Sequence, residues 1–200
     1  MKSSIALAVG VLASSLALAQ EPQQPAPTLA ANVCMSCHGP EGRSVSPVFP
    51  RLAGQQKAYI TAQLQAFRNR TRSDPLAQAY MWGMASQLSD SGIDALASYY
   101  SAQQPVAGTA GDAALMAEGK KIYTQGILAE KVPACASCHG ADAQGVGAFP
   151  RLGGQHVEYL LAQLEGFKSG VRANAPIMLG VVHNMTVDQL KAAATYAASK

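Results

Sequence analysis

The amino-acid sequence predicts an all-α protein built from two tandem domains of one kind. A block near the middle of the first half, FPRLAGQ at 49–55, returns in the second half as FPRLGGQ at 149–155. In both copies a stretch with apolar residues at helical spacing follows, and we find no strand pattern along the chain. Such self-similarity indicates a duplicated structural unit.

The chain opens with a predicted signal peptide, residues 1–19. Lys2 precedes an apolar run from Ile5 to Ala19, which ends in the small-x-small pattern of a cleavage site and is followed at once by polar residues. The run is too short to span a bilayer, although an uncleaved anchor is the alternative. We therefore expect an exported, periplasmic protein whose association with the membrane is at most peripheral.

Charge excludes two classes of partner. The chain has 15 basic and 12 acidic side chains, so its net charge is small. This balance gives no basic footprint for nucleic acid. It also gives no polybasic anchor for an anionic membrane.

The first domain is predicted at residues 20–103. After a Pro-rich start, a short leading helix enters the motif at Cys34, and a loop rich in Gly and Pro follows. Helical spacing of apolar residues predicts a middle helix over Tyr59–Phe67 and a final helix over Ile93–Tyr99. We expect a methionine-containing loop between these two helices.

A linker at 104–111 separates the halves, because this stretch consists mainly of Pro, Gly and small residues. The second domain, 112–200, repeats the order of the first. Its leading helix is predicted to be longer and better packed, since four residues share one helical face: Leu115, Gly119, Ile122 and Tyr123.

The middle and final helices of the second domain are predicted at Tyr159–Phe167 and Leu190–Tyr196. Thr186 and Gln189 have the spacing of a capping box directly before the final helix. His156 aligns with Gln56 in the repeat and is expected on the surface or in a loop.

Four cysteines form two C-x-x-C-H motifs, CMSCH at 34–38 and CASCH at 135–139. Two thiols one helical turn apart match the two vinyl groups of a haem, and the adjacent histidine faces the iron. The sequence therefore predicts two covalently bound haem c groups, one in each half. The predicted attachment and ligand residues are Cys34, Cys37, His38, Cys135, Cys138 and His139.

Three other uses of the cysteines compete with haem. Each pair could be a redox-active disulfide, but such motifs sit at strand-to-helix junctions, and no strands are predicted. The four thiols could bind one zinc ion, which would leave both histidines unexplained. A pair of structural disulfides is the third alternative.

The opposite axial ligand is predicted from the repeat. Aligning the two final helices pairs Met81 with Met178, whereas neither Met84 nor Met185 pairs with another methionine. Histidine and methionine together give a high-potential, six-coordinate iron. The alternative roles are methionine as a flexible core residue, and His183 in place of Met178 as the ligand of the second haem.

On these residues the chain resembles the cytochrome c4 family of dihaem cytochromes. The resemblance covers nearly the whole mature chain and adds MWGM at 81–84, IMLG at 177–180 and LSDSGIDALASYY at 88–100 to both haem motifs and both FPRL-x-GQ blocks. It implies two class I cytochrome c domains related by a pseudo-two-fold axis, with the haems meeting near the domain interface. It also implies axial ligation by Met81 and Met178.

The resemblance further implies that the carbonyls of Pro50 and Pro150 accept a hydrogen bond from the histidine that ligates each iron. Such a partner fixes the ring and raises its basicity.

The function implied is electron transport by a monomer, without catalysis. The resemblance implies shuttling to terminal oxidases such as the cbb3 type, with bc1-type complexes or dehydrogenases as donors. The alternative is a cytochrome subunit of a flavin-dependent sulfide dehydrogenase or another dehydrogenase complex. A dihaem peroxidase needs one haem that can open, and two equivalent methionines argue against it.

Overall fold

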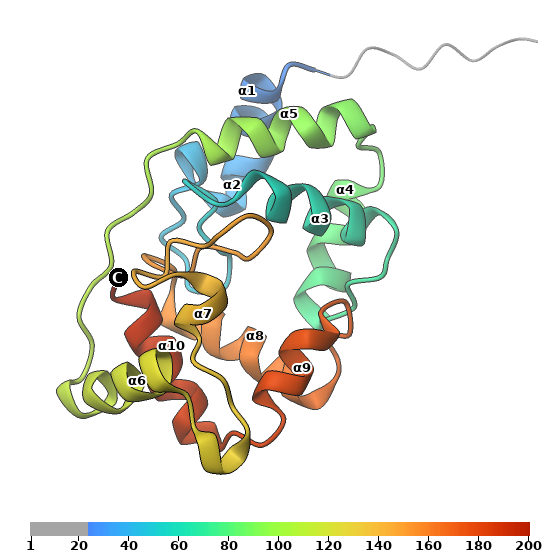
Figure 1. Ribbon diagram of the computed structural model, residues 1–200. Helices are drawn as coiled ribbons and strands as arrows, with labels where there is room; N and C mark the ends of the chain where they lie inside the picture. Colours follow the sequence, from blue (N-terminus) through green and yellow to red (C-terminus); the bar gives the residue numbers. More distant parts are fainter. Residues whose placement is uncertain (1–23) are drawn as a thin grey trace, which may run out of the picture.

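The computed structural model describes residues 24–200, so the predicted signal peptide, 1–19, lies outside the described residues. Over this range the protein is helical, and its β-type pairing consists of two isolated bridges. The all-α prediction is confirmed. The two halves lie one above the other, and the linker runs along one edge between them (Figure 1). No described helix is long and apolar enough to cross a bilayer.

The first half contains four main helical stretches. Its elements are α1 (Ala26–Leu29), η1 (Ala30–Cys34), α2 (Met35–His38), η2 (Pro40–Gly42), α3 (Lys57–Arg68), η3 (Ala77–Met81), α4 (Trp82–Ala85) and α5 (Asp90–Ser101). Among them α1, η1 and α2 run on continuously, and so do η3 and α4. The second half repeats this order with a longer first helix. Its elements are α6 (Ala113–Gln125), η4 (Leu128–Glu130), α7 (Ala136–His139), α8 (Val157–Ser169), α9 (Pro176–Val182) and α10 (Val187–Ala198).

The middle and final helices confirm the periodicity of the sequence. In the first half α3 and α5 bury Ile60, Leu96 and Tyr100 against each other. In the second half α10 begins with the predicted capping box: Thr186 Oγ1 accepts from the backbone of Gln189 at 3.2 Å, and the Gln189 side chain accepts from the backbone of Thr186. These two reciprocal hydrogen bonds satisfy backbone N–H groups that have no partner within the first turn of the helix.

The leading helices differ as predicted. In the first half α1 buries no residue, and it continues through the π-helical turn η1 into α2. In the second half α6 buries Gly119, Ile122 and Tyr123. A side chain at Gly119 would overlap the carbonyl of Ala192 on α10, so the missing side chain allows the two helices to approach closely. The longer helix ends at Gly126, whose φ of 73° favours glycine.

The predicted methionine-containing loops are wrong, because both methionines lie on short helices. Met81 ends the π-helical segment η3, and Met178 lies within α9. Pro176 occupies the first turn of α9, where a missing N–H costs nothing and the fixed φ suits a helix. The proline reads as a loop signal in the sequence, although at this position it starts a helix.

The linker packs against both halves. The backbone of Gly54, with φ 66°, lies against Pro105 closely enough that a side chain would clash. At the equivalent Gly154 a side chain would overlap the carbonyl of Val106. The FPRL-x-GQ blocks thus contact the linker in addition to the haem motifs. The two domains are therefore fixed to each other.

Candidate haem sites

The two C-x-x-C-H motifs have the same local structure. Each forms a short helix, α2 or α7, that ends directly after its histidine at a glycine with positive φ, Gly39 at 75° and Gly140 at 82°. A serine hydroxyl between the cysteines donates to a backbone carbonyl at 2.7 Å in both copies. The backbone of the motif therefore has the same local structure in the two halves, and the cysteines and the histidine of each copy line the interior cavity.

None of the four cysteines forms a disulfide in the structure. Burial raises the pKa of Cys34, and it raises the pKa of Cys135 to about 11. Redox-active thiols have lowered pKa values, and burial shifts the pKa of these two thiols in the opposite direction. In the described part of the chain no three Cys, His, Asp or Glu side chains gather as a metal site, so the four thiols do not share one zinc ion.

Each histidine is held by the carbonyl of a proline. His38 Nδ1 donates to Pro50 O at 2.9 Å, and His139 Nδ1 donates to Pro150 O at 3.0 Å. A carbonyl only accepts, so Nδ1 carries the proton and Nε2 keeps its lone pair. Burial lowers the pKa of both histidines, which favours the neutral ring that a metal requires.

The phenylalanine of each FPRL block packs beside the same histidine. Phe49 and His38 lie edge to face with ring centroids 6.3 Å apart, and Phe149 and His139 lie 6.2 Å apart. The repeat of these two residues therefore has a structural reason: the Phe ring packs beside the histidine, and the Pro carbonyl accepts a hydrogen bond from it. The arginine of the block contacts the other half of the molecule, as described below.

Met81 and Met178 both line the interior cavity, on the elements that follow the middle helices. Both are half-buried, and each packs against the core of its own half. Met84 also lines the cavity but is 59% exposed, and Met185 is buried in the core away from the cavity. His183 is exposed and does not line the cavity.

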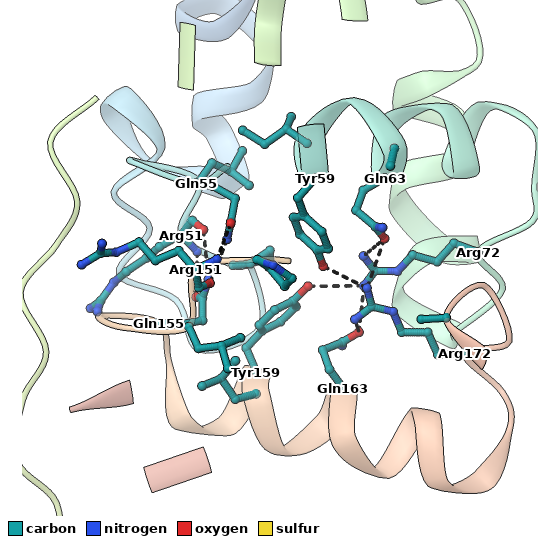
Figure 2. A pocket seen from close by; sticks show the side chains of 18 of the residues that line it. Arg51, Gln55, Tyr59, Gln63, Arg72, Arg151, Gln155, Tyr159, Gln163 and Arg172 are labelled. Atoms are coloured by element: carbon teal, nitrogen blue, oxygen red, sulfur yellow. Dashed lines mark hydrogen bonds between the residues drawn. The ribbon is translucent and has the colours of Figure 1, made fainter. Parts of the chain in front are cut away.

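A single cavity of about 560 Å³ reaches both haem motifs. Its lining comes from both halves and includes all four cysteines, the histidines of both C-x-x-C-H motifs, and the methionines at 81 and 178. Most of the lining is apolar. The polar part lies at the domain interface, where the two FPRL-x-GQ blocks meet and where α3 faces α8 (Figure 2).

The charges of the lining fit haem. The charged side chains of the described lining, apart from the histidines, are Arg51, Arg72, Asp74, Arg151 and Arg172. Four cations against one carboxylate leave an excess of positive charge along the cavity. Arg72 and Arg172 are buried, where a cation is costly without an anionic partner, whereas Arg51 and Arg151 are half-buried. Haem has an apolar ring and two propionate groups, and its iron alternates between the ferrous and ferric states. An apolar cavity with buried arginines along one side suits that combination.

Two glutamines join the domains in a pseudo-symmetric way. Gln155 Nε2 donates to the carbonyl of Arg51 at 2.9 Å, and its Oε1 accepts from the backbone N–H of the same residue at 2.9 Å. Gln55 makes the same pair of bonds to Arg151, at 2.9 and 2.7 Å. Each pair resembles a short strand pairing, so the two FPRL-x-GQ blocks are fixed to each other.

A second cluster lies between α3 and α8. Gln163 Oε1 accepts from Arg72 at 2.8 Å and from Arg172 at 2.6 Å, and Gln63 Oε1 accepts from the same two guanidinium groups at 3.0 and 3.1 Å. Figure 2 shows these side chains pointing toward one another from the two halves. Tyrosine hydroxyls complete the cluster.

The sequence analysis implies that the haems meet near the domain interface, but it does not identify these side chains. Arginine, glutamine and tyrosine recur at matching positions in both halves, and that recurrence was the available signal. The interpretation of His156 is incomplete, because it is part-buried and its Nε2 donates to the carbonyl of Ser44 in the other half at 3.0 Å. Gln56, its counterpart, donates across the interface to the carbonyl of Gln144 at 2.9 Å.

The cytochrome c family matches residues 24–102 and 116–199, one segment in each half. The cytochrome c4 structure of Acidithiobacillus ferrooxidans is 44% identical, with a TM-score of 0.78 over 84% of this chain and 98% of that chain. Cytochrome c-552 of Acidithiobacillus ferridurans is 45% identical over 177 residues, 88% of this chain and 76% of its own length.

A further relative, the thiosulfate dehydrogenase electron acceptor of Thiomonas intermedia, is 37% identical over 202 residues, 97% of this chain and 90% of its own length. Both domains, both haem motifs and the arrangement of the halves are thus accounted for by one family. The chain belongs to the cytochrome c family and, within it, to the dihaem cytochromes c4, which transfer electrons through two covalently bound haem c groups.

Proposed function

We propose that this protein is a periplasmic electron carrier that takes one electron per haem from respiratory donors and delivers it to a terminal oxidase such as the cbb3 type. Donors of suitable chemistry are bc1-type complexes and dehydrogenases. The signal sequence at 1–19 and the export that covalent haem attachment requires support the periplasmic location. The haem domains in this proposal are 20–103 and 112–200, with the linker at 104–111 between them.

Within the proposal, His38 and Met81 ligate the first iron, and His139 and Met178 ligate the second. The bonds from Nδ1 to Pro50 and Pro150 fix each imidazole so that Nε2 faces the cavity. Both methionines line the same cavity. Two ligands from the chain leave no coordination position for a substrate, so we infer electron transfer and not catalysis.

The observation that carries the proposal is the continuity of the interior. Both haem motifs open into one cavity, and hydrogen bonds from Gln55 and Gln155 hold its two halves together. An electron received at one site therefore has a fixed path length to the other. This arrangement suits a two-electron shuttle, whereas two loosely joined cytochromes would need no such network.

Rapid-mixing kinetics with purified partners test the proposal. Reduced holoprotein should be oxidised by a cbb3-type oxidase with both haems turning over, and a bc1-type complex should reduce it again. The reduced protein should bind no carbon monoxide, since both irons are six-coordinate. Carbon monoxide binding by the unmodified protein, or peroxide turnover, would contradict the closed sites.

A second candidate function is to accept electrons from a thiosulfate-oxidising dehydrogenase. The similarity to the Thiomonas intermedia acceptor spans nearly the whole chain and favours it. Adding thiosulfate and a purified thiosulfate dehydrogenase should then reduce both haems, and omission of the dehydrogenase should abolish the reduction. Stable co-purification with a flavoprotein would instead favour a subunit of a sulfide dehydrogenase complex.

A further inference from the structure

The last turn of each middle helix carries one basic side chain, Arg68 on α3 and Lys168 on α8. Both side chains are half-buried, and their positions match in the repeat although the residue types differ. Neither belongs to the described lining of the interior cavity, so neither is part of the polar cluster at the domain interface. Each instead bonds to the backbone of its own half.

Both cations bond to the turn that precedes the final helix. Arg68 Nη1 donates to the carbonyl of Leu88 at 2.8 Å. Lys168 Nζ donates to the carbonyl of Met185 at 2.6 Å and to that of His183 at 2.8 Å. A carbonyl that has no partner within a helix is stabilised by such a cation. The middle helix is thus tied to the same turn in both halves.

The bonded carbonyls occupy equivalent places relative to the methionines. Leu88 lies seven positions after Met81, and Met185 lies seven positions after Met178. Both residues stand directly before the N-cap of the final helix, α5 or α10. We call residues 77–88 and 176–185 the two ligand segments, since each begins with the methionine-bearing element and ends at the bonded carbonyl. The same contact therefore closes both segments.

Apolar packing also holds the ligand segments, but it acts without direction. Met81 and Leu88 pack on the cluster that contains Phe67 of α3, and Met178 packs on the cluster that contains Met185. Burial of apolar area favours contact and does not fix one position along a helix. A hydrogen bond from a charged donor is directional and stronger than a neutral one. The basic side chain therefore supplies a directional attachment of the segment to the middle helix.

We infer that Arg68 and Lys168 are positioning residues for the axial methionines. Each holds the end of its ligand segment against the middle helix and so opposes movement of the methionine away from the iron. The inference rests on the proposed ligation by Met81 and Met178. It adds the residues that keep this ligation closed to competing ligands.

Titration of the ferric holoprotein with imidazole tests the inference, because imidazole takes the sixth position only after the methionine has left it. Loss of the charge-transfer band of methionine-ligated ferric haem reports each displacement. Arg68→Met should raise the imidazole affinity of the first haem, and Lys168→Met that of the second. We expect about tenfold in each case, the scale of a lost hydrogen bond from a charged group. Met81→Ala and Met178→Ala assign the displacement steps to the two haems.

Two control variants separate this contact from general stabilisation of the first half. Lys57→Met removes an exposed ion pair with Asp94, 2.7 Å long, at the other end of α3, and it should leave the imidazole affinity unchanged. Asp90→Asn removes the surface ion pair of Arg68 and keeps the bond to Leu88. It should therefore change the affinity far less than Arg68→Met does.

Exchange of the two basic residues provides the rescue. Arg68→Lys and Lys168→Arg keep a cation that can donate to the same carbonyl, and each half already uses the other residue. Their imidazole affinities should stay close to those of the unmodified protein. Arg68→Gln and Lys168→Gln keep a neutral donor and should give intermediate affinities. The glutamine variants decide the question if a methionine substitution yields no holoprotein.

Unchanged imidazole affinity in Arg68→Met or Lys168→Met would overturn the positioning role of that residue. An equal rise in Lys57→Met would overturn it for Arg68 by showing that any loosening of α3 has this effect. Retention of both charge-transfer bands in Met81→Ala and Met178→Ala would instead refute the proposed ligation. Failure of the partner assays described above would refute the proposed shuttle and leave these titrations unaffected, so the ideas fail separately.

Discussion

The two halves of the molecule make the same contacts around their haem motifs. They differ in their leading helices and in the charged side chains at the interface between them. Both place a proline carbonyl about 3 Å from the ligand histidine, and both use a glutamine to bind the opposite FPRL block. The leading helices differ in length and packing, and the interface cluster has one carboxylate instead of two. The repeated contacts therefore identify what both haem sites share, and the unrepeated ones show where the two halves have different environments.

The strongest test of equivalence is removal of the methionines. Met81→Ala and Met178→Ala should each open one iron to carbon monoxide. Each should lower that haem's potential by roughly 200 mV or more, because axial ligands move haem potentials over about 0.8 V. Redox titration and carbon monoxide difference spectra measure both effects. Met84→Ala is the matched control, and the ligand assignment is wrong if that variant opens a site instead.

The buried ion pair at the interface should dominate stability. Arg72→Met leaves Asp74 buried without its cation, and we expect a loss of about 3–5 kcal/mol in the free energy of unfolding. Denaturant unfolding of the holoprotein measures it. Arg43→Met removes an exposed pair, Arg43 with Glu41 at 3.5 Å, and should cost less than about 1 kcal/mol. Equal losses in the two variants would mean that the buried ion pair contributes no more to the free energy of unfolding than the exposed one.

Substitutions in the leading helices of the two halves should change stability by smaller amounts. Gly119→Ala should destabilise the second half by about 1–3 kcal/mol, because the added methyl group meets α10. In the first half, Ala30 is 3% exposed and already fills the corresponding contact region, so Ala30→Gly should cost only about 0.5–1 kcal/mol. Thermal unfolding of the two variants compares them. A neutral Gly119→Ala variant would show that α6 and α10 can move apart.

Substitution of His156 should change the free energy of unfolding least, and the size of this change should depend on pH. Burial lowers the pKa of His156 and so does the nearby Arg51, while the bond to Ser44 and the charge of Glu158 oppose the shift. The folded protein therefore favours the neutral ring. Its contribution to stability is complete above the unfolded pKa of about 6.5 and is lost as the pH falls through the lower folded value.

His156→Gln introduces the residue found at the matching position 56 and should remove this part of the pH dependence. We expect a difference below about 1 kcal/mol, since the partly exposed ring is screened by solvent. Unfolding curves of both proteins between pH 5 and 8 check it. Parallel curves across this range would show that protonation of His156 does not couple to the domain contact.

Local patterns predicted most of the elements. Helical periodicity placed α3, α5, α8 and α10, and the capping box placed the start of α10. These elements are readable because neighbours along the chain determine them. The segments that carry Met81 and Met178 are short helical elements, which the prediction of loops there does not capture.

The sequence by itself determined the duplication, the all-α class, and the two covalent haem c groups, because cysteine and histidine spacing within one helical turn is a local property. Only the tertiary structure decided that the two haem motifs share one cavity, that glutamines at 55 and 155 bind across the halves, and that Arg172 lacks the carboxylate that Arg72 has. Those contacts join residues about a hundred positions apart, and burial gives them their energetic weight, so their charge balance follows from the packing of the halves and not from the order of residues along the chain.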